Sequence, residues 1–301
     1  MWKPLLAAAF ILVCVTRAEA AAPSRDALVV NTAWLASHMN DKDLVILHVG
    51  SEAGYKAGHI PGARLVDGKI LQVNTQEGLS VEVPPADMLH QQLEALGISD
   101  NSRVIVYNET DEFQRATRVL FTLDVAGLGD HSSLLDGGLA EWKKTGHPMS
   151  TDAPQMAQGH LAPLAIQPRV VDAKFVQSHL KTPGYDLIDA RAAVFYGGLV
   201  AKVTGDGHIP SARSLPYTSV YDSDGKLKSP EDLKALFAQA GVKSGDHVVA
   251  YCQVGGQSSA VVFAARTLGI EPQLYDGSFQ DWSKRGLPVE TSTTPGAAPG
   301  K

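Results

Sequence analysis

The stretch SPEDLKALFAQAGVKSGDHVVAYC, residues 229–252, indicates the fold class because it has the pattern of a helix followed by a buried strand. Ser229 followed by proline is typical of a helix start. Apolar residues then recur every three or four positions over residues 230–240, and Gly241 is a natural helix stop. HVVAY, residues 247–251, is a short apolar run typical of a strand that is buried on both faces.

This helix–strand unit occurs twice in the chain. PADMLHQQLEALGISDNSRVIVYN, residues 85–108, aligns with it without a gap. Two more pairs of blocks recur in the same order: AGHIPGARL (57–65) with DGHIPSARSL (206–215), and DGGLAEWKKTGHP (136–148) with DGSFQDWSKRGLP (276–288). The period of about 145 residues is that of a domain rather than of a solenoid unit. The sequence therefore predicts two tandem α/β domains, each with a mostly parallel sheet flanked by helices.

The duplication also suggests the domain limits. We expect a first domain over residues 24–150 and a second over residues 169–290. Residues 151–168 are rich in Pro, Gln and Ala, so we interpret them as a linker. Residues 291–301 have little to bury, and we expect a disordered tail there.

Residues 1–20 have the pattern of a signal peptide. Lys3 gives a positive start, residues 4–15 are apolar, and AEA at 18–20 offers small side chains for cleavage. The apolar run is shorter than the roughly twenty residues of a membrane span. We therefore expect a periplasmic or secreted protein with no stable membrane insertion after cleavage. A retained anchor is the alternative.

Composition argues against several other classes of protein. The 301 residues have a net charge of −6 and no basic block that could follow a phosphate backbone, so we expect no nucleic-acid partner. No histidine or cysteine cluster has metal-ligand spacing, so we expect no metal and no cofactor. Signal cleavage would remove Cys14 and leave Cys252 alone, without an internal disulfide. The oligomeric state is not indicated.

Cys252 stands directly after the strand at 247–251 and opens the loop of YCQVGGQSS, residues 251–259. Open α/β sheets place ligand sites at this end of their strands. Gly255 and Gly256 allow the backbone to curl so that N–H groups point inward, and the following helix adds its positive end. Such an anion cradle favours a thiolate and indicates a cysteine nucleophile. The alternative is an inert buried cysteine.

These motifs resemble those of rhodanese-type sulfurtransferases with two tandem rhodanese domains, the thiosulfate and 3-mercaptopyruvate sulfurtransferase family. The resemblance is carried by Cys252 on its loop, IDAR at 188–191, both GHIP blocks and both DG…W blocks. It implies a rhodanese fold and an enzyme that moves a sulfane sulfur from a small anionic donor, through a Cys252 persulfide, to cyanide or another thiophilic acceptor. It further implies that Arg191 binds the donor. We expect the loop to bind it too, through Gln253, Val254, Gly255, Gly256 and Gln257.

The first copy lacks the parts that this chemistry needs. Asn108 aligns with Cys252 and cannot form a persulfide, and Gly50 stands where the second copy has Arg191. The residues after Asn108 would repel an anionic donor because three of them are acidic: Glu109, Asp111 and Glu112. We therefore expect the first domain to be catalytically inactive and to pack against the second and shape its cleft.

Other residues are expected to be structural. Asp189 should order the local backbone or pair with a cation, because thiolate attack needs no general base. His59 and His208 belong to the two GHIP turns, and Trp142 and Trp282 to the two DG…W blocks. Since both copies have them and only one has a cysteine, we expect them in turns and cores.

The loop leaves the donor open. In the family, thiosulfate enzymes carry basic residues directly after the cysteine, and mercaptopyruvate enzymes carry small ones with a hydroxyl nearby. Here Gln253 and Val254 follow Cys252. 3-Mercaptopyruvate is therefore the alternative donor, and a non-catalytic exported sulfur carrier or binding module is the alternative of another class. A cysteine phosphatase is disfavoured because Gln257 or Ser258 stands where an arginine should close the loop.

Overall fold

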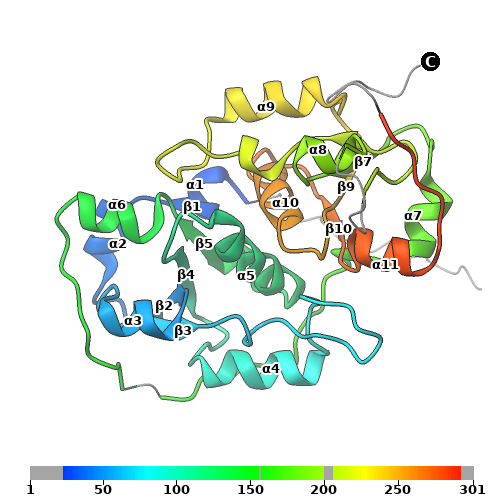
Figure 1. Ribbon diagram of the computed structural model, residues 1–301. Coiled ribbons are helices and arrows are strands. Elements are labelled where there is room, and N and C mark those ends of the chain that lie inside the picture. Colours follow the sequence, from blue (N-terminus) through cyan, green and yellow to red (C-terminus); the bar gives the residue numbers. More distant parts are fainter. Residues whose placement is uncertain (1–22, 156, 200–205, 293–301) are drawn as a thin grey trace, which may run out of the picture.

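The structure is a computed structural model that describes residues 23–155, 157–199 and 206–292. It has two lobes, one built by the blue-to-green first half of the chain and one by the second half (Figure 1). The predicted signal peptide at 1–20 and residues 293–301 of the predicted tail lie outside the described residues.

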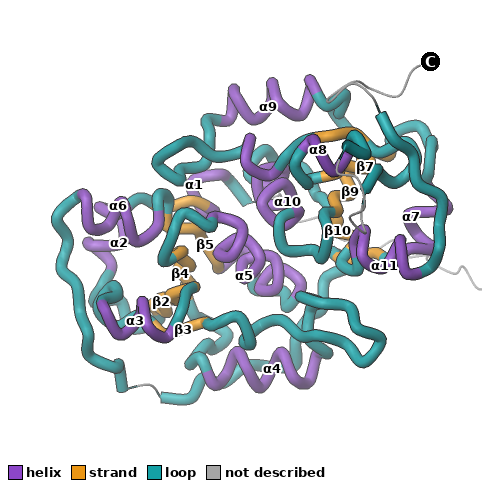
Figure 2. The backbone as a smooth tube through the Cα atoms, viewed as in Figure 1, coloured by secondary structure: helices purple, strands orange, loops and turns teal. Residues whose placement is uncertain are grey.

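The first lobe is a five-stranded sheet in the order β1-β5-β4-β2-β3, with helices around it (Figure 2). Its strands are β1 (Val29–Val30), β2 (Leu44–Val49), β3 (Arg64–Val66), β4 (Arg103–Asn108) and β5 (Ser132–Leu135). Its helices are α1 (Arg25–Leu28), α2 (Thr32–His38), α3 (Glu52–Ala57), α4 (Ala86–Ala95), α5 (Phe113–Val125), the 3-10 turn η1 (Gly129–His131) and α6 (Gly138–Lys144).

The second lobe repeats this arrangement in the order β6-β10-β9-β7-β8. Its strands are β6 (Val170–Val171), β7 (Tyr185–Asp189), β8 (Arg213–Ser214), β9 (His247–Tyr251) and β10 (Gln273–Tyr275). Its helices are α7 (Ala173–His179), α8 (Ala193–Tyr196), η2 (Tyr217–Ser219), α9 (Pro230–Gln239), α10 (Ser258–Arg266) and α11 (Ser278–Lys284). Every pairing between these strands is parallel, which confirms the predicted pair of α/β domains.

Helix α9 and strand β9 form as residues 229–252 predict. The Ser229 hydroxyl accepts a hydrogen bond from the Asp232 N–H at 3.1 Å, so it satisfies one of the free donors at the start of the helix. Leu233 and Phe237 are the residues of α9 that are buried, one turn apart on one face. Strand β9 is buried beyond its first residue because it lies between β7 and β10.

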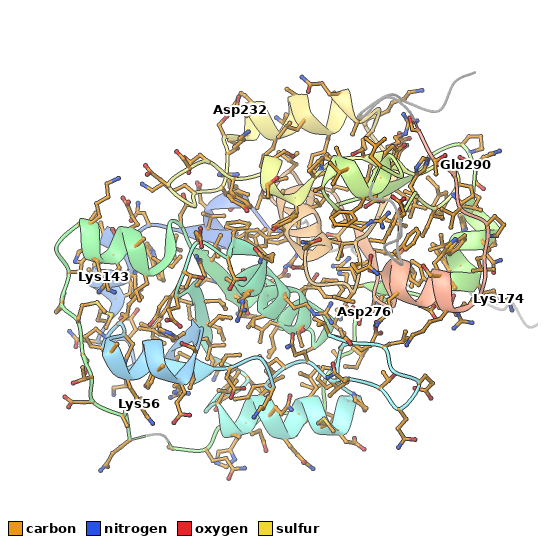
Figure 3. The ribbon with its side chains drawn as sticks, in the orientation of Figure 1. Lys56, Lys143, Lys174, Asp232, Asp276 and Glu290 are labelled. Atoms are coloured by element: carbon orange, nitrogen blue, oxygen red, sulfur yellow. The ribbon has the colours of Figure 1, made fainter. Side chains whose placement is uncertain are left out.

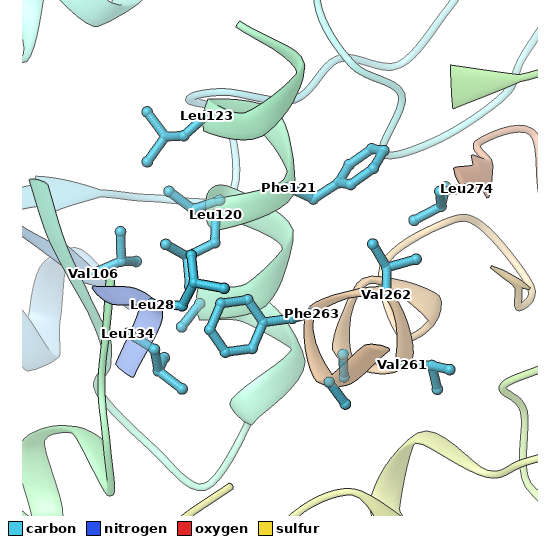
Figure 4. Close-up of a cluster of buried hydrophobic side chains, with 14 of the residues drawn as sticks. Leu28, Val106, Leu120, Phe121, Leu123, Leu134, Val261, Val262, Phe263 and Leu274 are labelled. Carbon is cyan, nitrogen blue, oxygen red and sulfur yellow. The ribbon is translucent and has the colours of Figure 1, made fainter. Parts of the chain in front are cut away.

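The two lobes share one apolar core. Helices α5 and α10 pack side by side between the sheets, and Figure 4 shows Phe263 of α10 directed toward α5, the helix that carries Leu120. Both side chains are buried in a single cluster that runs from Leu28 in the first domain to Leu274 in the second. Among the residues that the structure describes, no helix combines the length and apolar character needed to cross a bilayer.

Candidate active site

Cys252 lies where the central strands of the second sheet end. Strand β7 pairs with β9 so that Asp189 lies opposite Tyr251, and Cys252 is the next residue along the chain. Arg191 follows Asp189 by two residues and therefore lies at the same edge, as the sequence predicts. This edge holds the carboxyl ends of the strands, where parallel sheets place their ligands.

The Cys252 side chain is enclosed, with 1% of its surface exposed. Two serines hold it. The Ser258 hydroxyl, at the start of α10, lies 3.6 Å from the sulfur and 3.1 Å from the Gly255 carbonyl oxygen, so its one hydrogen is shared between these two acceptors. The Cys252 N–H donates to the Ser278 Oγ at 3.2 Å, and the Ser278 hydroxyl in turn donates to the Tyr275 carbonyl at 2.8 Å. Both the sulfur and the backbone of Cys252 are thus fixed by hydroxyl groups.

The carbonyl groups of the cysteine loop, residues 252–257, are held by the helices around it. The first two accept from the start of α11: Cys252 O from the Phe279 N–H and Gln253 O from the Gln280 N–H, both at 3.0 Å. Two later ones accept from the start of α10. Gly255 O binds the Ser258 hydroxyl at 3.1 Å, and Gly256 O binds the Ser259 hydroxyl at 2.7 Å.

This arrangement directs N–H groups of the cysteine loop away from the groups that bind its carbonyls. In a trans peptide the N–H points opposite to the carbonyl of the same unit, so four N–H groups face away from the helices that bind the carbonyls. They belong to Gln253, Val254, Gly256 and Gln257. Within the described parts of the chain, no acceptor is found for any N–H group of residues 253–257. An anion cradle requires amides of this kind, which are left for a ligand.

Arg191 is buried in a clamp of protein groups. Its Nε and Nη2 donate to the two carboxylate oxygens of Asp189, at 3.0 and 2.5 Å, and Nη2 also donates to the Gly207 carbonyl at 2.6 Å. Its guanidinium carbon lies 4.1 Å from the centre of the Phe279 ring. Burial favours a lower pKa for Arg191, but the Asp189 carboxylate outweighs it and raises the pKa, so the side chain stays charged.

Asp189 orders the local backbone and pairs with a cation at this edge of the sheet, as predicted. It pairs with Arg191, accepts the Arg191 N–H at 2.9 Å, and accepts the Tyr251 hydroxyl at 2.8 Å. The Tyr251 oxygen also accepts the Ile209 N–H at 3.0 Å, so the strand end is tied to the GHIP turn.

The duplicated histidines and tryptophans have structural roles, which confirms that prediction. The Nδ1 atoms of His59 and His208 each lie 2.8 Å from a backbone carbonyl, and each ring stacks on the tyrosine that supplies that carbonyl. Trp142 and Trp282 are fully buried, and each indole N–H donates to a proline carbonyl at 2.8 Å.

The corresponding edge of the first domain is chemically different. Asn108 lies in the place of Cys252, and its side chain donates to the Thr110 carbonyl. The N–H groups of the asparagine loop, residues 108–113, are partly used within the domain: Glu109 N–H binds Val49 O at 2.9 Å, and Phe113 N–H binds Asp111 O at 2.9 Å. Such a loop offers fewer free amides to an anion.

Glu109 and His48 fill the space that Arg191 and Asp189 occupy in the second domain. The Glu109 carboxylate covers Gly50, where a Cβ atom would overlap it, and accepts the Ser51 N–H at 2.6 Å. His48 binds the Tyr107 hydroxyl at 2.8 Å, as Asp189 binds Tyr251. Burial lowers the pKa of His48 to about 4 despite the nearby Glu109 carboxylate, so this position is neutral at pH 7.

The sequence reading missed Ser278 as a partner of Cys252. Ser278 has a φ of 52°, a left-handed conformation that is uncommon for serine, and the matching first-domain residue is Gly138 with a φ of 55°. The glycine-to-serine change between the two DG blocks was the available signal. A serine kept in this backbone conformation indicates a use for its hydroxyl.

A pocket of about 280 Å3 opens beside the cysteine loop. Gly256 forms part of its wall, and the first domain supplies the rest, including Gly50, Gln114 and Arg118. Across the described ranges, no group of three or more His, Cys, Asp or Glu side chains is arranged to hold a metal ion.

Comparison with known proteins agrees with this geometry. The sequence profile of the rhodanese-like domain matches residues 31–145 and 172–285. The chain is 30% identical over 280 residues to the 3-mercaptopyruvate sulfurtransferase of Escherichia coli K12, covering 87% of this chain and 97% of the relative. It is 28% identical over 266 residues to the thiosulfate sulfurtransferase of Azotobacter vinelandii, with the same coverage of 87% and 97%. The crystal structure of SseA from Escherichia coli, which has the rhodanese fold, superimposes with a TM-score of 0.72 at 29% identity, covering 83% of this chain and 98% of SseA.

Proposed function

The chain belongs to the rhodanese-like family as a tandem two-domain sulfurtransferase, and from this premise we propose that it transfers sulfur from thiosulfate through a persulfide on Cys252. The observation that carries the proposal is the cysteine loop itself. The thiol of Cys252 begins a run of amides that have no acceptor in the described chain, at the carboxyl end of a central strand. Such a site stabilises negative charge on the sulfur.

In the first half-reaction the Cys252 thiolate attacks the outer sulfur of thiosulfate. A new S–S bond forms on Cys252, the S–S bond of the donor breaks, and its electron pair leaves with sulfite. The persulfide keeps one negative charge, which the free N–H groups of the cysteine loop and the Ser258 hydroxyl stabilise. The Arg191 guanidinium lies at the same edge, where Asp189 holds it in place as an ion pair.

In the second half-reaction an acceptor nucleophile attacks the outer sulfur of the persulfide. With cyanide, the new C–S bond yields thiocyanate, and the S–S bond breaks to return the Cys252 thiolate. A small thiol can take the sulfur in the same way. Both steps use one site in turn, so the kinetics should be of the ping-pong type.

Access to the sulfur requires a small movement, because Cys252 exposes only 1% of its surface. Gly255 and Gly256 give the loop the backbone freedom for it. We place the entrance at the pocket beside Gly256, since it borders the cysteine loop and is lined mainly by the first domain. In this scheme the first domain shapes the cleft without carrying out chemistry.

3-Mercaptopyruvate is the second candidate donor, and one observation favours it. The Ser258 hydroxyl lies 3.6 Å from the Cys252 sulfur, and no side chain of the cysteine loop is charged. A singly charged donor therefore suits this loop better than a doubly charged one. The comparison of the two donors at equal concentration decides between them.

Intact-protein mass spectrometry tests the proposal directly. The protein is incubated with thiosulfate or with 3-mercaptopyruvate, and one added sulfur atom is expected on the wild type and none on Cys252→Ser. Cyanide should remove the sulfur and release thiocyanate. A wild-type protein that gains no sulfur from any sulfane donor contradicts the proposal. A stable persulfide that no small acceptor discharges indicates the sulfur-carrier alternative instead.

We also propose that the protein is exported with residues 1–20 as a cleaved signal peptide. The support is the positive start, the short apolar run and the AEA site in the sequence. Expression of the full chain followed by cell fractionation and N-terminal sequencing tests this. A mature protein that begins at Ala21 in the periplasm or medium is expected, and an uncleaved chain in the cytoplasm contradicts it.

A further inference from the structure

The first domain binds the turn that leads into α11. Asp276 opens this turn, and its carboxylate accepts Nη1 and Nη2 of Arg118 at 2.6 and 3.3 Å and the Val83 N–H at 2.8 Å. Arg118 and Val83 both belong to the first domain, whereas Asp276 belongs to the second. Arg118 and Asp276 are buried, and Asp276 lies where the cyan loop of the first domain meets the second lobe (Figure 3).

The same turn holds Cys252. Ser278, two residues after Asp276, accepts the Cys252 N–H, and the next two N–H groups, of Phe279 and Gln280, bind the Cys252 and Gln253 carbonyls. Any displacement of Asp276 is therefore passed to the backbone of the cysteine loop over three hydrogen bonds. Ser278 has little freedom to absorb it, because its backbone is in the left-handed region.

Gly255 contacts the ion pair from the other side. Its φ is 82°, and a Cβ atom there would lie 2.8 Å from Asp276 Oδ1 and 3.2 Å from Arg118 Nη1. The cysteine loop thus packs against the Arg118–Asp276 pair at its middle and is tied to the Asp276 turn at its beginning. Both contacts depend on where Arg118 holds the carboxylate.

The duplication does not reproduce this pair in the first domain. Asp136 corresponds to Asp276 and accepts the Leu227 N–H from the second domain at 2.9 Å, as Asp276 accepts that of Val83. However, α10 carries no positive side chain before Arg266 at its last position, so it offers Asp136 no counterpart of Arg118. Among the described residues, the cations near Asp136 are instead Arg25 and Lys226, neither of which lies on α10.

We propose that Arg118 is a positioning residue that the first domain supplies to the Cys252 site. It fixes Asp276, and through Asp276 it fixes the turn at 276–278 and the amides of the cysteine loop. The first domain is then part of the catalytic apparatus although its own loop is inactive. This inference rests on the proposed role of Cys252, but it concerns the geometry of the loop and can be tested without a sulfur donor.

The test compares Arg118→Met with Arg266→Met. Arg266 is a matched control because it is also a buried arginine paired across the domain interface, with Asp130 at 2.7 Å and Asp124 at 3.3 Å. It lies at the far end of α10 from the cysteine loop. Each variant loses one buried guanidinium, so both should lower the melting temperature of the full chain.

Only Arg118→Met should change Cys252. We expect the alkylation of Cys252 by iodoacetamide at pH 7 to slow about tenfold or more, because the amides are no longer held in place. Arg266→Met should alkylate like the wild type. Equal alkylation of the two variants, whether slowed or not, overturns the proposal.

Arg118→Lys keeps the charge but loses the two-pronged contact with Asp276. Arg118→Lys should slow the alkylation of Cys252 less than Arg118→Met does. If Arg118→Met does not fold, Arg118→Lys becomes the test, and alkylation of this variant at the wild-type rate overturns the proposal. The alkylation measurement also distinguishes the role of Arg118 from the proposed sulfur transfer. Failure of the wild type to accept sulfur contradicts the proposed function, while its alkylation rate still reports the role of Arg118.

Discussion

The cysteine loop and the asparagine loop follow equivalent strands of the two sheets, but their peptide groups make different hydrogen bonds. In the asparagine loop, the N–H groups of Glu109 and Phe113 bind carbonyls of the same domain. In the cysteine loop, neighbouring helices take the carbonyls and leave the amides without acceptors in the described chain. Under our proposal, the capacity to hold an anion therefore depends on how the peptide units are oriented as well as on the presence of a thiol.

The scaffold under both loops is nearly the same. Tyr107 and Tyr251 each accept an N–H from a GHIP isoleucine, and each hydroxyl binds a side chain on the neighbouring strand. That side chain is neutral His48 in one domain and Asp189 in the other. A buried arginine needs an anionic partner. The second domain therefore has both Asp189 and Arg191, whereas the first domain has neutral His48 together with Gly50.

The largest expected effect comes from moving the thiol between the loops. In Asn108→Cys combined with Cys252→Ser, we expect no persulfide after thiosulfate treatment and turnover below about 1% of wild type, because the asparagine loop has fewer free amides and three acidic residues. Mass spectrometry and thiocyanate release are the measurements, with Cys252→Ser as the control. If the transplanted cysteine gains sulfur within tenfold of the wild-type rate, the contrast between the loops does not explain activity.

A smaller effect is expected at the position where glycine in one domain is serine in the other. Ser278→Ala removes the acceptor of the Cys252 N–H, and a hydrogen bond of this kind contributes about 0.5–1.5 kcal/mol, or roughly three- to tenfold in the rate of persulfide formation. Ser283→Ala is the control, since Ser283 lies on the same helix and its hydroxyl donates to the Phe279 carbonyl, away from Cys252. Equal rates for the two variants would show that Ser278 has no role at the site.

The third expected effect concerns stability at the domain junction and leaves the chemistry of the site unchanged. Burial, with Asp276 and Asp281 nearby, raises the pKa of Glu82 from 4.5 to about 8, although Arg118 opposes the shift. A carboxyl whose folded pKa is raised favours folding below pH 4.5 and loses that contribution progressively as the pH rises to about 8. Glu82→Gln should therefore flatten the fall in melting temperature between pH 5 and pH 8.

Glu52→Gln provides the comparison for this measurement, because Glu52 is exposed and pairs with Lys56 at the surface. It should leave the fall in melting temperature between pH 5 and pH 8 unchanged, because the pKa of Glu52 is lowered by the hydrogen bond with Lys56 and lies below this range. A Glu82→Gln protein whose melting temperature falls between pH 5 and pH 8 as steeply as that of the wild type contradicts the raised pKa.

Much of the fold was predictable because it depends on local pattern. The three duplicated blocks predicted two domains, and Ser229 with the apolar face of residues 230–240 predicted α9. Cys252 and Arg191 were placed at one sheet edge because parallel strands end together. The duplicated His and Trp pairs were recognised as structural by their presence in both copies.

The contacts that set the site were not predictable in the same way. Arg118 and Asp276 are 158 residues apart and meet only because α5 packs across the domain boundary, which no periodicity encodes. The clamp on Arg191 depends on the path of the chain around Gly207. The role of Ser278 depends on a backbone torsion, which sequence suggests only where the residue is glycine.

The core that α5 and α10 share has a consequence for how the protein can vary. Either half, if expressed by itself, would leave Leu120 or Phe263 facing water, so it should aggregate rather than persist as a free module. The duplicated halves have thus become mutually dependent for solubility. A deletion of the first half should therefore make the second half insoluble, even though the first half lacks Cys252.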